Sequence, residues 1–207
     1  MTSEADRIIQ LYERHALEFD AERNGRISIE KSWLDQFASL LPPGAAVLDI
    51  GCGSGQPISR YLIERGFDVT GVDASPTLIS YCHHRFPDRP FFVADMRTLA
   101  LNKRFDGLIA WDSFFHLPRD DQRRMFPVFA RHATKGTALL FTSGASEGEA
   151  IGTYHGEPLY HSSLSADEYR QLLEANGFEV VAHKSEDPSC GNHTVWLARS
   201  VGDPGAN

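Results

Sequence analysis

The sequence has few cysteines and no long apolar run. Its three cysteines, Cys52, Cys82 and Cys190, are odd in number, far apart and in no CxxC pair. They predict the reduced thiols of a cytoplasmic protein, not a disulfide framework. No stretch approaches the ~18 consecutive apolar residues of a membrane span. The opening MTSEADRIIQLYERH has no signal-peptide core, so we expect no membrane partner.

Basic residues are also scarce, at 20 Lys plus Arg against 28 Asp plus Glu, for a formal net charge of −8. That balance argues against a protein that coats nucleic acid. The string GxxxxGK[ST] of phosphate-binding loops is absent. His155, His161, Cys190 and His193 are possible zinc ligands, but their spacing fits no standard finger, so we expect no metal site.

Apolar runs of strand length alternate with helical patterns through the middle of the chain. The runs cover 45–50, 67–72, 90–94, 105–111 and 137–143, and the helical patterns cover 57–65, 76–84 and 119–132. Pro127 is expected to kink or split the last of these helices. This alternation is typical of a mainly parallel sheet covered on both faces.

The two ends of the chain are organised differently. Apolar residues at helical spacing predict two helices, over 8–19 and 29–40, with a turn at Asn24-Gly25 between them. Residues 144–163 are polar and glycine-rich, and we expect a long loop there. A capping box at Ser165 predicts a helix to Asn176, followed by strands over 178–185 and 193–200. We divide the chain into a helical cap (1–44), the main part of the same domain (45–200) and a tail (201–207).

A glycine-rich turn between the first predicted strand and its helix is the clearest functional motif. It reads Asp49-Ile-Gly-Cys-Gly-Ser-Gly55. Alternating glycines there allow positive φ and let a ligand approach the backbone. Gln56 occupies the sixth position of the GxGxxG dinucleotide pattern, so that match is incomplete. Asp73 lies 22 positions after Gly51, where a carboxylate can accept both ribose hydroxyls of an adenosine-containing ligand. The Asp49 carboxylate would repel phosphate and suits a ligand amino group.

Four segments then resemble successive motifs of the class I S-adenosylmethionine-dependent methyltransferases. They are DIGCGSG (49–55), GVDAS (71–75), VADM (93–96) and FDGLIAWDSFFHL (105–117), and the resemblance covers about 45–143. It implies a three-layer α/β sandwich with a Rossmann-like, mostly parallel, seven-stranded sheet whose last strand is antiparallel. It also implies S-adenosylmethionine as cofactor and in-line methyl transfer to an acceptor, for which the acidic charge favours a small molecule.

The resemblance also assigns roles to individual residues. Asp49, Gly51, Cys52, Gly53 and Trp111 would surround the methionine part, and Asp73, Ala74, Ser75, Asp95 and Met96 the ribose and adenine. Tyr12 and Arg23 are candidate cofactor contacts from the N-terminal helices. His116 is the candidate general base, because its pKa is ordinarily near neutrality. Tyr154, His155, Tyr160 and His161 are candidates for one wall of the acceptor pocket.

Alternatives remain open at this point. The glycine turn is also compatible with a nicotinamide-dependent oxidoreductase, and a protein that holds S-adenosylmethionine without turnover would show the same motifs. The string Gly144-Ala-Ser-Glu-Gly148 matches the GxSxG nucleophile motif, but the residues after it are poor helix formers.

Overall fold

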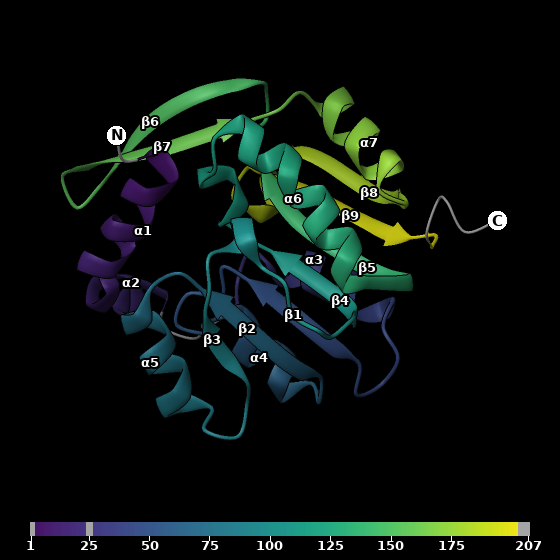
Figure 1. Cartoon of the computed structure of the whole chain (residues 1–207), viewed down its shortest axis with the longest axis horizontal. Helices are drawn as coiled ribbons and strands as arrows, with labels where there is room; N and C mark the ends of the chain where they lie inside the picture. Colours follow the sequence, from purple (N-terminus) through teal and green to yellow (C-terminus); the bar gives the residue numbers. More distant parts are fainter. Residues whose placement is uncertain (1–2, 24–26, 203–207) are drawn as a thin grey trace.

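The computed structural model describes residues 3–23 and 27–202, so the predicted Asn24-Gly25 turn and most of the predicted tail lie outside the described residues. A seven-stranded sheet in the order β3-β2-β1-β4-β5-β9-β8 forms the centre of the molecule (Figure 1). Its strands are β1 (Ala46–Ile50), β2 (Asp68–Asp73), β3 (Phe91–Val93), β4 (Phe105–Ala110), β5 (Ala133–Ser143), β8 (Phe178–Asp187) and β9 (His193–Ser200).

The strand directions confirm the expected fold. β1, β2, β3, β4 and β5 pair in parallel, whereas β9 is antiparallel to both of its neighbours, β5 and β8. β9 is therefore the one reversed strand of this sheet, and it is the last in the sequence. The strand order reverses between β1 and β4, and ligands of open α/β sheets bind beside such a switch point, at the carboxyl ends of the strands.

Helices cover both faces of the sheet, because alternate strand residues are apolar on both sides. Leu48, Leu108 and Phe141 point to the face covered by α6 (Arg119–His132) and α7 (Ala166–Ala175). Val47, Ile109 and Leu140 point to the face covered by α3 (Lys31–Ser39) and α4 (Ile58–Glu64). α5 (Pro76–Arg85) packs beside β2 and β3. The result is the three-layer sandwich that the sequence predicts.

Two local predictions are wrong, and a third, that Pro127 kinks or splits its helix, is wrong as to the split. The first predicted helix is two helices, α1 (Glu4–Arg14) and α2 (Ala16–Arg23), with a break at His15. Pro127 lies inside α6 without splitting it, since the helix runs unbroken for 14 residues and is anchored by buried apolar residues on either side of the proline. The expected loop over 144–163 contains a hairpin, β6 (Gly148–Tyr154) and β7 (Glu157–Ser163).

The sequence pattern did not predict the hairpin, because its strands bury few side chains. Most β6 residues are exposed, so the apolar alternation that identifies a half-buried strand is missing. The hairpin instead lies against α1, where Tyr160 packs with Ile8 and Leu11. Both elements therefore cover the carboxyl ends of the strands, as Figure 1 shows at its upper left.

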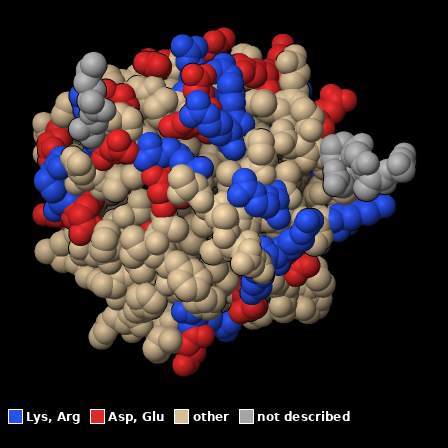
Figure 2. Space-filling view, in the orientation of Figure 1, with Lys and Arg blue, Asp and Glu red and all other residues tan. Residues whose placement is uncertain are grey.

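Short 3₁₀ helices complete the structure: η1 (Met96–Thr98), η2 (Phe114–His116) and η3 (Pro188–Cys190). η1 occupies the connection from β3 to β4, where no full crossover helix fits. Acidic and basic side chains are interleaved at the top of the face in Figure 2, whereas the area around α5 carries few. Among the described residues, no helix has the length and apolar character that crossing a bilayer requires.

Candidate active site

Two adjoining cavities lie between the strand ends and the N-terminal helices. The first holds about 720 Å³ of space, part of it open to solvent, and is lined by α1, the ends of β2 and β3, and η1. The second holds about 740 Å³ and is lined by the glycine turn, the end of β4 and residues of β7 and β9. Tyr12, Phe19, Gly51, Gly53, Asp112 and His116 line both, so the two cavities meet there.

The glycine turn is shaped by side chains that press on its backbone. Gly51 has φ 76° and Gly53 has φ 56°, in the left-handed region that favours glycine. A Cβ at Gly51 would lie 2.3 Å from the Ser113 Cβ, and one at Gly53 would lie 2.7 Å from the Phe19 ring. The Ser113 hydroxyl is fixed in turn by donating to the Ile50 carbonyl, 2.8 Å away. Both glycines are therefore required by local geometry.

Asp73, at the end of β2, holds this turn in place. One of its carboxylate oxygens accepts from the Gly53 amide and the other from the Ser75 amide, each at 2.9 Å. Ser75 caps α5 itself by accepting from the Leu78 amide, so Asp73 is not needed for that role. Burial raises the pKa of Asp73, and the two amide donors oppose that rise. Asp73 lines the first cavity, and a carboxylate oxygen can accept more than one hydrogen bond, so a ribose hydroxyl could also donate to it.

Asp49 is 2% exposed and lies in the second cavity, below the glycine turn. Ser59 of α4 donates to its carboxylate at 2.6 Å. Burial raises the pKa of Asp49 to about 6, although the Ser59 hydrogen bond opposes the rise. An ionised carboxylate in this position is stabilised by a cationic ligand group and destabilised by an anionic one.

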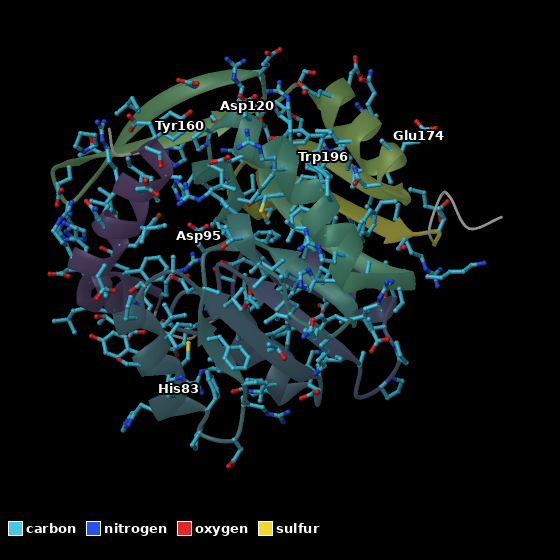
Figure 3. The ribbon with its side chains drawn as sticks, in the orientation of Figure 1. His83, Asp95, Asp120, Tyr160, Glu174 and Trp196 are labelled. Atoms are coloured by element: carbon cyan, nitrogen blue, oxygen red, sulfur yellow. The ribbon has the colours of Figure 1, made fainter. Side chains whose placement is uncertain are left out.

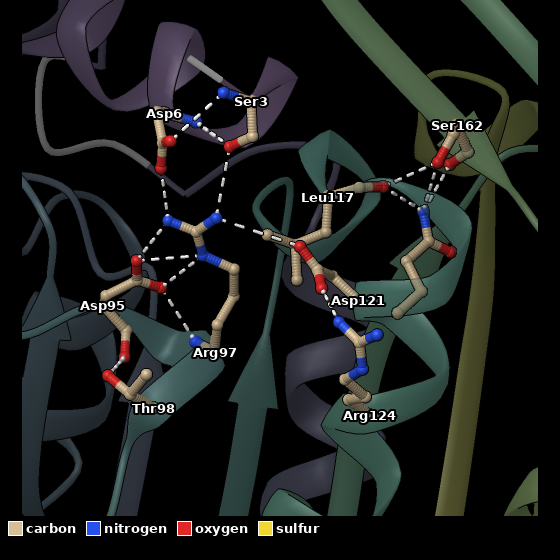
Figure 4. A network of polar contacts seen from close by, with 10 residues as sticks. Ser3, Asp6, Asp95, Arg97, Thr98, Leu117, Asp121, Arg124 and Ser162 are labelled. Carbon is tan, nitrogen blue, oxygen red and sulfur yellow. Dashed lines mark hydrogen bonds and ion pairs between the residues drawn. The ribbon is translucent and has the colours of Figure 1, made fainter. Parts of the chain in front are cut away.

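Asp95, at the end of β3, is tied to the neighbouring Arg97 and lies near the middle of the molecule (Figure 3). The Arg97 guanidinium bonds both Asp95 oxygens at 2.6 to 3.0 Å. It also donates to Asp6 of α1 at 2.6 Å and to Ser3 at 3.4 Å, as Figure 4 shows. Arg97 therefore links the start of α1 to the loop that lines the first cavity with Asp95 and Met96.

His116 of η2 forms a hydrogen-bonded chain at the junction of the cavities. Its Nδ1 lies 2.8 Å from the Tyr160 carbonyl oxygen, which can only accept, so Nδ1 carries the hydrogen. Nε2 is then an acceptor, and the Tyr12 hydroxyl donates to it at 3.0 Å. Burial lowers the pKa of His116 to about 4 and raises the pKa of Tyr12, so at neutral pH the imidazole is uncharged and the phenol keeps its proton.

Trp111 and Asp112, which follow β4, place polar groups in the second cavity. Asp112 pairs with His193 of β9 at 3.0 Å and approaches Arg23 of α2 at 3.8 Å. Burial alone would raise the pKa of Asp112, but the His193 hydrogen bond and the charges of His193 and Arg23 lower it overall. The Trp111 Nε1 and Arg23 Nε atoms are buried and have no hydrogen-bond partner among the described residues. Both residues line the second cavity, and an N–H group that is buried without an acceptor is costly.

The four predicted pocket residues on the hairpin have different surroundings. His161 lines the second cavity, with its ring centroid 4.7 Å from that of His116. Tyr160 is buried beside α1, while Tyr154 and His155 each bond Glu22 of α2 at 3.0 Å. Only His161 of the four thus lines either cavity, and the other three attach the hairpin to the N-terminal helices. Among the described residues, no group of three or more His, Cys, Asp or Glu side chains is placed to hold a metal ion.

Sequence reasoning missed several residues of the site. Asp112 carried a usable signal, because it follows a buried strand as Asp73 and Asp95 do. Phe19, the last apolar residue of the first predicted helix, was not predicted as a site residue, yet it lines both cavities. Glu13 of α1 accepts from the Thr77 hydroxyl at 2.6 Å and from the Ser75 hydroxyl, a pairing that nothing in the local sequence indicates.

Comparisons with known proteins agree with this geometry. A family model described as "Methyltransferase domain" matches residues 19–183. An O-methyltransferase of Pyrenophora dematioidea is 27% identical over 168 residues, which cover 75% of this chain and 62% of the relative. A dTDP-3-amino-3,4,6-trideoxy-alpha-D-glucopyranose N,N-dimethyltransferase of Streptomyces venezuelae is 28% identical over 174 residues, or 83% of this chain and 67% of the relative. The chain thus spans about two thirds of the length of these relatives.

Solved structures share the fold. The sugar N-methyltransferase KedS8 of a Streptoalloteichus species superposes with a TM-score of 0.71 at 18% identity, covering 88% of this chain and 91% of that one. The glycopeptide N-methyltransferase MtfA, crystallised with S-adenosyl-L-homocysteine, gives 0.67 at 19% identity, covering 83% and 90%. The family model covers most of the chain, so the chain belongs to the methyltransferase-domain family, as its resemblance to class I S-adenosylmethionine-dependent methyltransferases predicts.

Proposed function

We propose that this protein transfers the methyl group of S-adenosylmethionine to a hydroxyl group of a small molecule. The observation that carries the proposal is the chain Tyr12–His116–Tyr160 carbonyl at the junction of the two cavities. When bound, S-adenosylmethionine supplies an electrophilic methyl group on a positively charged sulfur. The residues of this chain need only bind the two partners, align them and receive a proton.

The lining of the cavities fits this cofactor. Asp73 offers acceptors to ribose hydroxyls, and Ala74, Ser75, Asp95 and Met96 surround the rest of the first cavity, where adenine would lie. In the second cavity, Asp49 suits the cationic amino group of the methionine part, beside Gly51, Cys52 and Gly53. The unpaired Trp111 Nε1 and Arg23 Nε supply two N–H donors for its carboxylate.

Charge also separates this cofactor from a dinucleotide. Four carboxylates line the two cavities, those of Asp49, Asp73, Asp95 and Asp112, and Arg23 is the only lysine or arginine among the described lining residues. A pyrophosphate there would face carboxylates without matching cations, which is unfavourable. S-adenosylmethionine carries two positive groups and one negative group, so these carboxylates favour it over a nicotinamide dinucleotide.

The histidine chain favours a hydroxyl acceptor. An alcohol oxygen that attacks a methyl group becomes a strongly acidic oxonium, which even a weak base deprotonates. The Tyr12 oxygen can accept that proton while its own proton moves to His116 Nε2, so the positive charge ends on the imidazole. An amine acceptor attacks as the free base and can keep its proton afterwards, so it does not need this base. His116 is therefore the proposed general base, and Tyr12 carries the proton to it.

Calorimetric titration with S-adenosylmethionine, S-adenosylhomocysteine and NAD tests the cofactor. We expect binding of the first two, and tighter binding of NAD would overturn the proposal in favour of an oxidoreductase. Methyl transfer from labelled S-adenosylmethionine is then measured over a panel of small alcohols and phenols. His116→Ala and Tyr12→Phe should lower kcat by about 10²- to 10⁴-fold while S-adenosylhomocysteine affinity stays within about threefold.

A matched control is His83→Ala, which removes an exposed histidine of α5 that lies far from Tyr160 in Figure 3. This variant should keep the full rate. Binding of both S-adenosyl ligands with no transfer to any panel member would instead support a binding protein without turnover. Unchanged kcat in His116→Ala would remove the histidine from the mechanism.

A further inference from the structure

A third cavity lies beneath the hairpin and shares His161 with the second cavity. It holds about 740 Å³ of space, open on one side, and is lined by the end of β5, the 144–147 connection and the facing strands β6 and β7. Phe115 and His161 line both this cavity and the second one. Their ring centroids are 5.3 Å apart, and His161 is in turn 4.7 Å from His116. The contacting rings of Phe115 and His161 therefore form the wall that the second and third cavities share.

The wall of this cavity is held by hydrogen bonds of its own. Gln122 of α6 donates to the Ser162 carbonyl and hydroxyl oxygens, both at 2.8 Å, and to the Leu117 carbonyl at 2.9 Å (Figure 4). Tyr169 donates to the Gln122 amide oxygen at 2.6 Å, which fixes the amide orientation. This buried network attaches β7 to α6, so hydrogen bonds within the fold hold the wall of the cavity in place.

The charges around the cavity have one sign. Its described lining residues include Glu147 and Glu149 but no lysine or arginine. The charge of Glu147 is partly balanced by Arg119, 2.8 Å away, and Glu149 adds a second carboxylate at the exposed rim. An anionic group entering here would lose water without gaining a cationic partner, which is costly. An uncharged or cationic group meets no such penalty.

We propose that the third cavity binds the part of the acceptor that does not react, and that it selects small uncharged or cationic acceptors over anionic ones. The proposal rests on the proposed function, because it takes the Tyr12–His116 junction as the place of methyl transfer. The Phe115 and His161 rings are in contact, so this binding mode requires them to separate, with the acceptor hydroxyl group at Tyr12 and the remainder of the acceptor beneath the hairpin. A nucleoside diphosphate or another phosphate-bearing acceptor is excluded by this charge pattern.

The charge preference of the third cavity can be measured at a cysteine introduced into its lining. Ala150 pairs with His161 in the hairpin register and lines the third cavity. The Ala150→Cys variant is labelled with two methanethiosulfonate reagents, one with a cationic trimethylammonium group and one with an anionic sulfonate group. The labelling rate of each reagent is divided by its rate with a free thiol in solution. We expect the cationic reagent to react about 10-fold faster than the anionic one. Adding Glu149→Gln should shrink that ratio, and equal or faster labelling by the sulfonate reagent would overturn the proposal.

The wild-type chain is the blank for this labelling, since Cys52, Cys82 and Cys190 are 7%, 0% and 1% exposed. Binding of S-adenosylhomocysteine is measured in the same samples. Its absence in the wild-type chain would count against the proposed function alone, whereas a wrong labelling ratio with normal binding would count against the third cavity alone.

Three phenols of one skeleton test the ligand class. Tyramine is cationic, tyrosol is uncharged and 4-hydroxyphenylacetate is anionic. Each is titrated into the protein loaded with S-adenosylhomocysteine, and Ala150→Trp, which fills the cavity from an exposed strand position, is the matched variant. We expect tyramine and tyrosol to bind at least about fivefold more tightly than 4-hydroxyphenylacetate, and Ala150→Trp to abolish the difference without changing S-adenosylhomocysteine affinity. Tightest binding of the anionic phenol would overturn the proposal.

Discussion

The two cavities that meet at His116 differ in how their polar groups are satisfied. In the first, Asp73 and Asp95 accept from protein donors on both oxygens, and Ser75 is engaged by Glu13 and Leu78. In the second, Asp49 and Asp112 are paired, but Trp111 Nε1 and Arg23 Nε are buried without partners within the described ranges. We therefore expect the first to be organised before its ligand arrives and the second to gain hydrogen bonds when the ligand binds. Substitutions should accordingly act differently on the two sides.

Removing the carboxylate of Asp73 should have the largest effect. Asp73→Ala leaves the Gly53 and Ser75 amides unpaired and removes the ribose acceptor, so we expect S-adenosylhomocysteine affinity to fall by about 100-fold, or about 2.7 kcal/mol. Calorimetric titration of the folded variant, checked by circular dichroism, measures this. Asp73→Asn keeps one acceptor oxygen and should give an intermediate loss. Undiminished affinity in folded Asp73→Ala would contradict the predicted ribose site.

The buried carboxylate of Asp49 should lower the stability of the free protein while it strengthens cofactor binding. Its raised pKa of about 6 means that the folded state disfavours the ionised form, so the destabilisation is full above pH 6 and fades as pH falls towards 4. Asp49→Asn should therefore raise the free energy of unfolding by about 1 to 3 kcal/mol at pH 8 and change it little at pH 4. Urea unfolding at both pH values measures this.

The same group should make cofactor affinity depend on pH. Protonation of Asp49 removes the charge that faces the cationic amino group, so we expect wild-type S-adenosylmethionine affinity to fall as pH drops through about 6. Asp49→Asn should bind more weakly at pH 8 and lose this dependence. A variant that kept the wild-type pH profile would show that another group is responsible.

Trp111 should test the unpaired donors of the second cavity with a smaller effect. Trp111→Phe removes a buried N–H that has no protein partner, so the stability of the free protein should not fall by more than about 1 kcal/mol. Cofactor affinity should nevertheless fall by about 10-fold, because the ligand loses a donor. Trp196→Phe is the matched control, since its Nε1 already donates to Ser143 at 3.0 Å. The control should lose stability and keep cofactor affinity. If Trp111→Phe instead lost stability and kept cofactor affinity, the proposed difference between the two cavities would be wrong.

Arg97 should have the smallest effect of the four. Arg97→Met breaks the contact between Asp6 of α1 and the Asp95 loop, which is partly exposed, and we expect S-adenosylhomocysteine affinity to weaken by about two- to fivefold. Stopped-flow binding should show the change in the dissociation rate. Arg7→Met, which removes an exposed pair with Glu4 inside α1, should leave that rate unchanged.

The sequence predicted the sheet and the glycine turn well for physical reasons. Buried parallel strands are almost continuously apolar, as β1 and β4 are, and the positive φ of Gly51 and Gly53 restricts those positions to one residue type. The hairpin was missed because its stability comes from contacts with α1 that are distant in sequence. The break at His15 was missed for a similar reason, since His15 bonds Glu157 of β7 at 2.7 Å.

The site shows the same division. The sequence could place Asp49, Asp73 and Asp95 at one edge of the sheet, where they line the two cavities, because each lies in or just after a strand; their roles toward the cofactor stay predictions. The chain Tyr12–His116–Tyr160 was not predicted, because it joins α1, η2 and β7 across 104 and 44 residues of sequence. Pairings of that kind are visible only once the fold brings the three elements together.

The attachment of the hairpin to the N-terminal helices has a kinetic consequence. Glu157 bonds Arg14 and His15, and Glu22 bonds Tyr154 and His155, so four contacts join the element above the first cavity to the one above the third. Each of these partly exposed contacts is weak alone, but together they couple the hairpin to the N-terminal helices. We therefore expect a movement of these helices that opens the first cavity to shift the hairpin as well, so that product release on the two sides is synchronised.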